Sequence, residues 1–287
     1  MIIVTGATGR LGSQVVRQLI ERVPADAVGV SVRDAARAAD FAARGVRVRR
    51  GDFTDPGSLP AAFEGATQVL IVSANDTGGA AVAQHATAID AARAAGVERI
   101  LYTSHQGAAA DSLFAPMPDH AAAERYLAEV GTPFTALRNG FYASTVPLLL
   151  GLALETGELV APADGPVSWT AHANLAEAAA ILLSGENRYE GATPPLTAPD
   201  ALDLDDVADI LTRLTGRTVR RVVADDDEWV AGLIGNGVPE AQANMLLGMF
   251  RASRNGEFDV TGPALEKLLG RSATPLSSVL EEVVASR

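Results

Sequence analysis

The sequence predicts an α/β fold, in which a doubly wound parallel sheet is followed by a smaller, mostly helical C-terminal lobe. Two observations predict it. In the first half of the chain, short runs rich in β-branched residues alternate with alanine-rich stretches of helical length, as in parallel sheets covered on both faces. After Gly140 this alternation weakens. At 287 residues the chain is long enough for one large core with a smaller lobe beside it.

The expected elements follow from these runs in order. The β-branched runs predict strands at 2–5, 28–32, 46–50, 68–72, 99–103 and 134–138. The alanine-rich stretches predict helices at about 10–22, 35–44, 58–64, 79–95 and 119–130. Beyond Gly140 we expect turns at 161–166, strands near 167–170 and 218–223, helices at 174–184 and 204–215, and short helices from 226 onward.

The composition limits both partners and chemistry. A net charge of -12, without any run of Lys or Arg, argues against binding to nucleic acid. The lack of cysteine excludes disulfides and cysteine nucleophiles. The apolar stretches are too short for a bilayer and the first residues do not resemble an export signal, so we expect a cytoplasmic protein that does not bind membranes. Among the 23 basic residues, Lys267 is the single lysine.

The first strand runs into TGATGRLGSQVV, in which Gly6, Gly9 and Gly12 are spaced by three. Gly6 permits a tight turn, Gly9 lets a pyrophosphate approach the backbone, and Gly12 lets the next helix pack closely on the strand. The N-terminus of that helix then offers free amides and a positive dipole end to phosphates. Because more strand and helix units follow, we interpret this turn as a dinucleotide phosphate site.

The end of the second strand discriminates between the two nicotinamide dinucleotides. It reads SVRDAAR, with Arg33 first and Arg37 one helical turn later. Arginine at this place accommodates a ribose 2'-phosphate, whereas an acidic residue accepts hydrogen bonds from the free hydroxyls of NAD. We therefore predict NADP(H), with Asp34 as the one feature that would instead suit NAD.

Two further loops complete a predicted groove at the carboxyl edge of the sheet. GDFTD follows the third strand, where Asp52 and Phe53 can flank an adenine. VSAND follows the fourth strand, where Ser73 and Ala74 would pass beneath the ribose. Because the carboxyl ends of parallel strands lie at one edge, these loops should face the same groove.

Several motifs together resemble those of a known family. They are TGATGRLG, SVRDAAR, RGDFTDPGSL, AARAAGVERILYTS, TPFTALRNGFY, LTGRTV and GVPEAQANML. Over nearly its whole length the chain resembles the NmrA-like atypical short-chain dehydrogenase/reductases, in the branch of the NAD(P)H:quinone oxidoreductase 2 and triphenylmethane reductase types. The resemblance implies a Rossmann-type sheet with a substrate lobe, NADP(H) as cofactor, and hydride transfer to a quinone or similar flat conjugated acceptor. Homodimers are common in such proteins.

The resemblance also implies roles for individual residues. The pyrophosphate would be held by Gly6, Thr8, Gly9, Arg10 and Leu11, the 2'-phosphate by Arg33, and the ribose by Ser73 and Ala74. The nicotinamide end would be surrounded by Ser104, Arg138, Asn139 and Phe141. We expect residues 1–140, with return segments at about 167–215, to form the NADP-binding domain, and 141–166 and 216–287 to form the substrate-binding lobe.

The acid–base pair of most short-chain dehydrogenases is missing. They use Tyr-x-x-x-Lys, in which the ammonium lowers the pKa of the tyrosine, yet none of the 4 tyrosines here has a lysine four positions later. A quinone that accepts hydride becomes a phenolate with delocalised charge, so it needs a weaker proton donor than an isolated ketone. The missing pair therefore favours quinones, with catalysis resting on close contact between nicotinamide and acceptor and on exclusion of water.

By resemblance, His120 in PDHAAAERYL stands where the tyrosine would be, and Glu124 stands where the lysine would be. We assign His120, Tyr142 and Asn139 as candidate catalytic residues. His120 and Glu124 lie one helical turn apart and could share a proton, or the stretch could be an ordinary helix that starts at Asp119. We expect no metal site, because the other histidines belong to different segments.

Two other functions fit the same residues. A reduced quinone could react with oxygen, which would make the protein a monooxygenase on an aromatic polyketide. Alternatively, the chain could bind NADP without turnover and act as a redox sensor that regulates a partner. The retained sequence RNGF, residues 138–141, favours an enzyme over a sensor.

Overall fold

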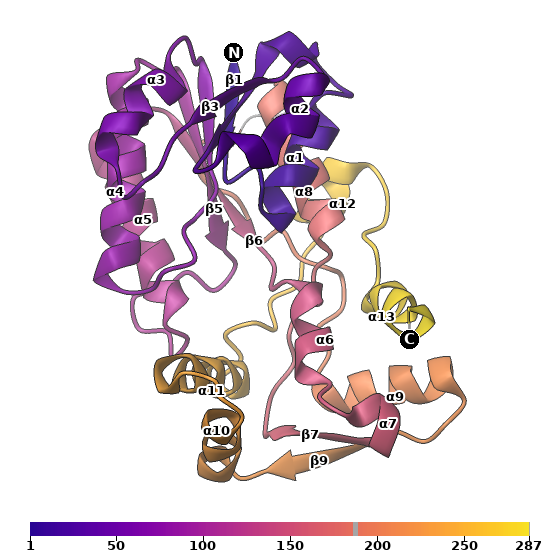
Figure 1. Cartoon of the computed structure of the whole chain (residues 1–287). Helices are drawn as coiled ribbons and strands as arrows, with labels where there is room; N and C mark the ends of the chain where they lie inside the picture. The colour runs from indigo at the N-terminus through magenta and orange to yellow at the C-terminus, as the bar shows by residue number, and fades with distance from the viewer. Residues whose placement is uncertain (186–188, 287) are drawn as a thin grey trace.

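Seven parallel strands form the central sheet of the computed structural model, which describes residues 1–185 and 189–286 (Figure 1). Their order is β3-β2-β1-β4-β5-β6-β8. The strands are β1 (Ile2–Thr5), β2 (Val28–Val32), β3 (Arg47–Arg50), β4 (Gln68–Ile71), β5 (Arg99–His105), β6 (Phe134–Asn139) and β8 (Gly191–Ala192). Val4 pairs with Val30 on one side and with Leu70 on the other. The strand order reverses direction at β1 and β4, and ligands of such sheets bind in the crevice at this place.

Helices cover both faces of this sheet, as the buried character of its central strands requires. Every residue of β1, β2 and β5 is buried. On one face lie α1 (Arg10–Leu19), α2 (Ala39–Ala43), α8 (His172–Ser184) and α12 (Ala264–Leu269), which share one apolar core. On the other face lie α3 (Leu59–Phe63), α4 (Gly79–Ala94) and α5 (Pro116–Val130), which share another.

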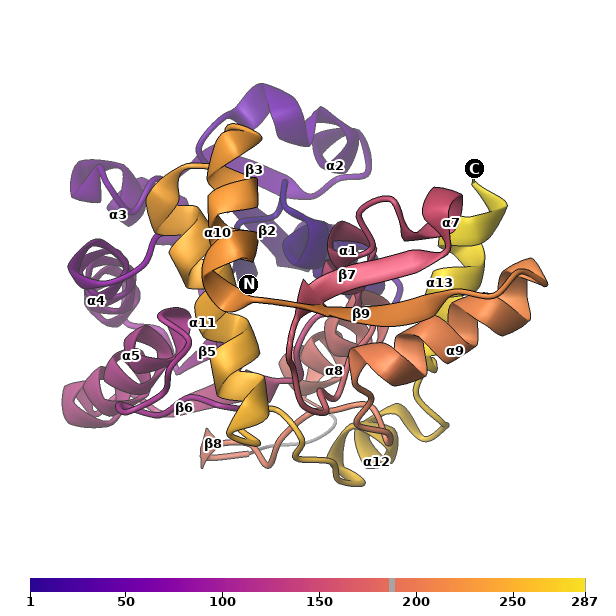
Figure 2. The same cartoon turned by 90° about the horizontal axis from the view of Figure 1, so that it is seen from below.

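A second layer of structure lies at the carboxyl edge of the sheet. It contains a two-stranded parallel sheet of β7 (Glu158–Pro162) and β9 (Arg220–Ala224). Its helices are α6 (Val146–Leu149), α7 (Ala153–Thr156), α9 (Leu204–Thr215), α10 (Asp226–Gly235), α11 (Glu240–Arg254) and α13 (Leu276–Ala285). Figure 2, which is seen from below, places α10 and α11 across the end of the large sheet. Phe141, Trp169, Phe250 and Phe258 belong to the core of this layer.

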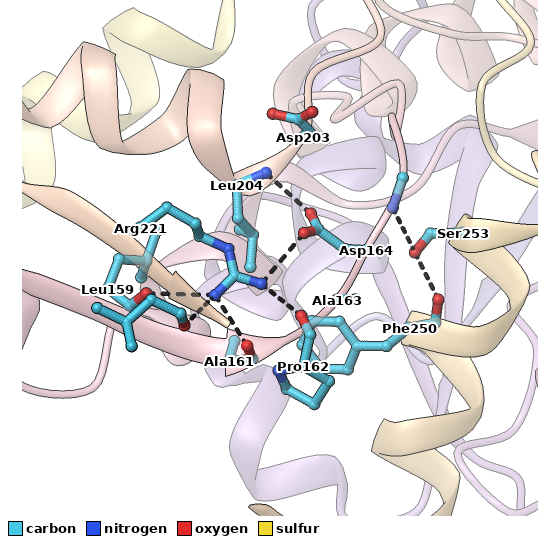
Figure 3. A network of polar contacts seen from close by, with 12 residues as sticks. Leu159, Ala161, Pro162, Ala163, Asp164, Asp203, Leu204, Arg221, Phe250 and Ser253 are labelled. Atoms are coloured by element: carbon cyan, nitrogen blue, oxygen red, sulfur yellow. Dashed lines mark hydrogen bonds and ion pairs between the residues drawn. The ribbon is translucent and has the colours of Figure 1, made fainter. Parts of the chain in front are cut away.

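Arg221 of β9, whose side chain is buried, joins the two short strands to the loop that follows β7 (Figure 3). Its guanidinium donates to the carbonyl oxygens of Ala161 at 2.8 Å and of Pro162, and it lies 3.2 Å from a carboxylate oxygen of Asp164. Asp164 also accepts a hydrogen bond of 2.8 Å from the backbone N–H of Leu204, at the start of α9. The ion pair therefore connects β7, β9 and α9.

The sequence predictions differ from the structure mainly in the second half. Turns were expected at 161–166, but β7 already occupies Glu158–Pro162. The prediction of a strand near 167–170 is wrong, because Val167 makes only an isolated bridge to Leu202 and Thr170 makes only one to Tyr142. The two-residue strand β8 is too short to produce a periodic pattern, so the sequence did not indicate it. Within the described residues, no helix combines the length and apolar character needed to cross a membrane.

Candidate functional site

A groove of about 480 Å³ lies at the carboxyl edge of the sheet, where the strand order reverses. The loops that follow the first four strands of the large sheet in chain order all contribute to its wall. Of the predicted cofactor residues, it brings together Gly6, Thr8, Gly9, Arg33, Asp52, Phe53, Ser73 and Ala74. Arg37 also lines it, as do Thr54, Asn75, Asp76 and Gln84, which the sequence analysis did not single out. Three of these four polar residues belong to the predicted loops GDFTD and VSAND, and Gln84 lies on α4.

The glycine turn leaves room that side chains would fill. Gly6 has a φ of +59° and accepts a hydrogen bond of 2.9 Å from the N–H of Gly9. A Cβ on Gly12 would lie 2.4 Å from the carbonyl oxygen of Gly6, so any larger residue would push α1 away from β1. Helix α1 begins after Gly9 without a side-chain cap, so its first-turn amides are free for a ligand.

The two arginines after β2 and the acid between them face different ways. Arg33 and Arg37 are exposed and line the groove, whereas Asp34 does not belong to its lining. The Asp34 carboxylate instead accepts a 3.0 Å hydrogen bond from the N–H of Ala36 and caps a short 3₁₀ helix. The groove therefore presents positive charge at the place where an acidic residue would select NAD.

The loop after β3 is held by its own hydrogen bonds. Asp52 accepts from the N–H of Thr54 at 2.9 Å and from its hydroxyl at 2.8 Å. These bonds are the main reason why the pKa of Asp52 is lowered, and the charge of Arg33 adds to them. The N–H of Asp52 donates to the hydroxyl of Ser58 at 2.9 Å. Phe53, half-buried between these anchors, is thus fixed in the groove wall.

The backbone after β4 is held from beneath by side chains that the sequence analysis missed. The N–H of Ser73 donates to the hydroxyl of Thr103 at 2.8 Å, and the N–H of Ala74 donates to Nε2 of His85 at 3.0 Å. Thr103 and His85 are both buried, on β5 and α4. Nothing in the local sequence points to these partners, since Thr103 is 30 residues from Ser73 and His85 is 11 residues from Ala74.

His120 and Glu124 lie on one face of α5 but contact different groups. Nδ1 of His120 is 2.9 Å from the hydroxyl of Tyr102, and burial lowers the pKa of His120 to about 3. Glu124 accepts a 2.6 Å hydrogen bond from Ser104 and two from Arg138, at 3.0 and 2.6 Å. No hydrogen bond joins these two described side chains, so their spacing of one helical turn does not identify their actual partners. Among the described residues, no group of His, Asp and Glu could hold a metal ion.

The residues expected at the nicotinamide end lie beyond the groove lining, around β5 and β6. Ser104 and Arg138 are bound to Glu124, and Phe141 is buried against Trp169 and Phe258, with ring centroids at 5.3 and 5.1 Å. Within the described residues, the buried Oδ1 of Asn139 has no hydrogen-bond partner.

Three predicted site residues remain, which are Tyr142, Arg10 and Leu11. The ring of Tyr142 packs on His172 with centroids 4.2 Å apart, and burial raises the pKa of Tyr142 to about 12. Arg10 is exposed at the start of α1, and its charge contributes to lowering the pKa of His172. Leu11 is buried in the core, so only its backbone can contact a ligand. Whether any of these residues touches a cofactor or an acceptor stays a prediction.

Comparisons with known proteins agree with this geometry. The chain is 36% identical to Quinone oxidoreductase 2 of Escherichia coli strain K12, over 96% of each chain. It is 34% identical to the NAD(P)H azoreductase of Xenophilus azovorans, over 86% of this chain and 85% of that one. Its structure matches the crystal structure of the E. coli NADPH-dependent quinone oxidoreductase complexed with NADPH, with a TM-score of 0.93, 33% identity, and coverage of 99% and 100%.

The family assignment rests on nearly the whole chain. A second solved structure, the triphenylmethane reductase of Citrobacter sp. complexed with NADP(H), matches with a TM-score of 0.90 and 34% identity over 98% of this chain and 99% of that one. The model of the NmrA-like family matches residues 1–283. The chain therefore belongs to the NmrA-like family.

Proposed function

We propose that this protein is an NADPH-dependent reductase that transfers hydride to a quinone or a similar conjugated aromatic acceptor. The observation that carries the proposal is the groove, in which a glycine cradle and the free N-terminus of α1 face two arginines. Relatives named for quinone and azo reduction support the choice of acceptor.

The residues present fit NADP(H). The close approach of Gly12 to Gly6 lets the first-turn amides of α1 serve the pyrophosphate, with Thr8 and Arg10 beside them. Arg33 and Arg37 supply the charge for a 2'-phosphate. In the same groove, Asp52 and Phe53 would flank the adenine, and Ser73 and Ala74 would lie along the ribose. When bound, NADPH supplies the hydride.

The surroundings of the expected acceptor favour an acceptor that needs no strong acid. By resemblance, His120 stands at the position of the tyrosine in a Tyr-x-x-x-Lys pair, and the hydroxyl of Tyr102 lies 2.9 Å from its ring. Burial keeps both side chains uncharged by lowering the pKa of His120 and raising that of Tyr102. A phenolate produced by quinone reduction spreads its charge over the ring, so hydrogen bonding and later protonation by water are enough. Asn139 and Tyr142, together with Phe141, would position this ring.

The lobes and the assembly belong to the same proposal. Residues 1–140 and most of the return segments at about 167–215 would hold the cofactor, and 141–166 and most of 216–287 would supply the acceptor side. Two helices depart from these expected bounds, since α9 packs in the core of the second layer and α12 packs on the large sheet. The family resemblance favours a homodimer that acts on small molecules in the cytoplasm. Sedimentation equilibrium measures the oligomeric state directly.

A panel of quinones, assayed for NADPH oxidation with and without oxygen, tests the proposed function. The reductase predicts rapid, oxygen-independent oxidation with at least one quinone. Turnover that needs oxygen and yields a hydroxylated product would instead indicate the monooxygenase. Tight NADPH binding without turnover on any panel member would indicate the sensor.

A further inference from the structure

A chain of hydrogen bonds leads from the wall of the cofactor groove to His120. The N–H of Ala74, which lines the groove, donates to Nε2 of His85 at 3.0 Å. The hydroxyl oxygen of Tyr102 lies 3.3 Å from Nδ1 of His85 and 2.9 Å from Nδ1 of His120. His85 and Tyr102 are buried, whereas His120 is partly exposed. The chain thus connects α4, β5 and α5 at the carboxyl edge of the sheet.

The backbone amide at one end fixes the direction of each proton. A backbone N–H can only donate, so Nε2 of His85 accepts and a neutral His85 carries its proton on Nδ1. That proton is donated to Tyr102, which leaves the Tyr102 hydroxyl proton for Nδ1 of His120. His120 accepts at Nδ1, and the proton of its neutral ring is therefore on Nε2.

Burial keeps all three side chains uncharged at neutral pH. It lowers the pKa of His85 to about 4 and that of His120 to about 3, and it raises the pKa of Tyr102. Deprotonation of Tyr102 would also place its charge near the carboxylates of Glu124 and Asp119. The chain therefore holds neutral hydrogen bonds in the resting protein.

The other groups that face the chain have fixed partners of their own. Glu124 is paired with Arg138, with oxygen and nitrogen 2.6 Å apart, and Asp119 accepts a 2.7 Å hydrogen bond from the N–H of Gly78. The ring of His105 packs on His120 with centroids 6.3 Å apart, and its Nδ1 accepts from the N–H of Gly107 at 3.1 Å. Tyr142 also faces Tyr102, and its own pKa is raised.

We propose that His85 and Tyr102 are positioning residues that hold His120 as a neutral donor, through Nε2–H, to the acceptor oxygen that gains charge during hydride transfer. This rests on the proposed function, because it needs an acceptor beside the nicotinamide. The hydride reduces the quinone to a delocalised phenolate, NADPH becomes NADP⁺, and water protonates the product. This series of hydrogen bonds does not conduct protons from solvent, because it begins at the backbone N–H of Ala74, which does not release its proton.

The tautomers of the histidine rings test the chain without any turnover, by NMR of protein with isotope-labelled histidine. We expect His85 as the Nδ1–H tautomer and His120 as the Nε2–H tautomer, both neutral from about pH 5 to about pH 8. Tyr102→Phe should leave His120 as a mixture of tautomers. The matched control is Tyr126→Phe on α5, whose hydroxyl binds Asp90 at 2.9 Å, and it should change neither ring. His85 as the Nε2–H tautomer, or a cationic His120 at neutral pH, would overturn the inference.

Turnover tests the role of the donor. His120→Phe should lower kcat on the order of a hundredfold, as when an oxyanion donor is removed. His120→Gln, which keeps an N–H donor, should retain more activity, and Tyr102→Phe should lose roughly tenfold in kcat with KM for NADPH unchanged. Unchanged kcat in a His120→Phe variant that still binds NADPH would contradict this inference alone. A wild-type protein that binds NADPH and reduces no quinone would contradict the proposed function and the donor role with it.

Discussion

The carboxylate of Glu124 holds the guanidinium of Arg138 through two hydrogen bonds, from Nε at 3.0 Å and from a terminal nitrogen at 2.6 Å. Ser104 donates to the same carboxylate at 2.6 Å. Glu124 thus ties α5 to the ends of β5 and β6, and the contact raises the pKa of Arg138. The acid that helical spacing suggested as a partner for His120 is instead an anchor for two neighbouring strands.

Glu124→Ala should lower the free energy of unfolding by about 1–3 kcal/mol, because the half-buried Arg138 and the buried Ser104 lose their acceptor. Glu129→Ala is the matched control on the same helix. Its contact with Arg125 spans 3.9 Å between side chains that are 73% and 64% exposed, so its loss should cost about 0.5 kcal/mol or less. Urea unfolding followed by circular dichroism measures both variants, and equal losses would contradict the anchoring role.

Arg33→Ala should weaken NADPH binding on the order of tenfold or more and leave NADH binding nearly unchanged, because only NADPH carries the 2'-phosphate that the guanidinium would bind. The control is Arg44→Ala, an exposed arginine after α2 that does not line the groove. Titration of each variant with both cofactors by calorimetry gives the comparison. Equal weakening of NADPH and NADH by Arg33→Ala would refute the assignment of NADPH.

Two adjacent arginines on β9 should differ sharply in their effect on stability. Arg221→Leu removes the cation that pairs with the largely buried Asp164 and the donor to several carbonyl oxygens, so it should cost about 3–5 kcal/mol. Arg220→Leu removes an ion pair with Glu158 in which the arginine side chain is 70% exposed, and it should change stability by about 1 kcal/mol or less. Thermal and urea unfolding measure this difference. A similar, small cost for both would mean that the network in Figure 3 contributes little to the fold.

Stability should fall as the pH is lowered below about 6.5. Burial is the main cause that lowers the pKa values of His85 and His172 to about 4 and those of His105 and His120 to about 3. In the unfolded chain the histidine pKa returns to its ordinary value of 6.5. Below that pH the unfolded chain therefore binds protons that the folded state does not bind. Between the unfolded and folded pKa values, each histidine lowers the free energy of unfolding by up to about 1.4 kcal/mol for every pH unit.

Comparison with His85→Gln isolates one of these contributions. The free energy of unfolding of the wild type should drop more steeply between about pH 7 and about pH 5 than that of the variant, whatever their difference at neutral pH. Urea unfolding at several pH values gives both slopes. Parallel slopes would show that His85 titrates normally in the folded protein.

Local sequence was enough for the first half of the fold and for the groove. IIVT and VGVSV are buried strands because their β-branched residues suit both faces of a covered sheet, and the loops after them meet at one edge because parallel strands end there. Contacts between segments that are distant in the sequence could not be predicted from local patterns. The bond between Tyr102 and His120 spans 18 residues and two kinds of element, and no spacing rule predicts it. The weak strands β7 and β8 likewise depend on partners far along the chain.

Single-turnover oxidation of bound NADPH tests the central claim most directly. Protein saturated with NADPH is mixed with a quinone without oxygen, and cofactor absorbance is followed by stopped flow, once with ordinary NADPH and once with NADPH deuterated at the transferred position. We predict a fast decay that yields one hydroquinone per NADPH and is slowed by the deuterium. Tightly bound NADPH that is oxidised no faster than in buffer would contradict the assignment of this protein as a reductase.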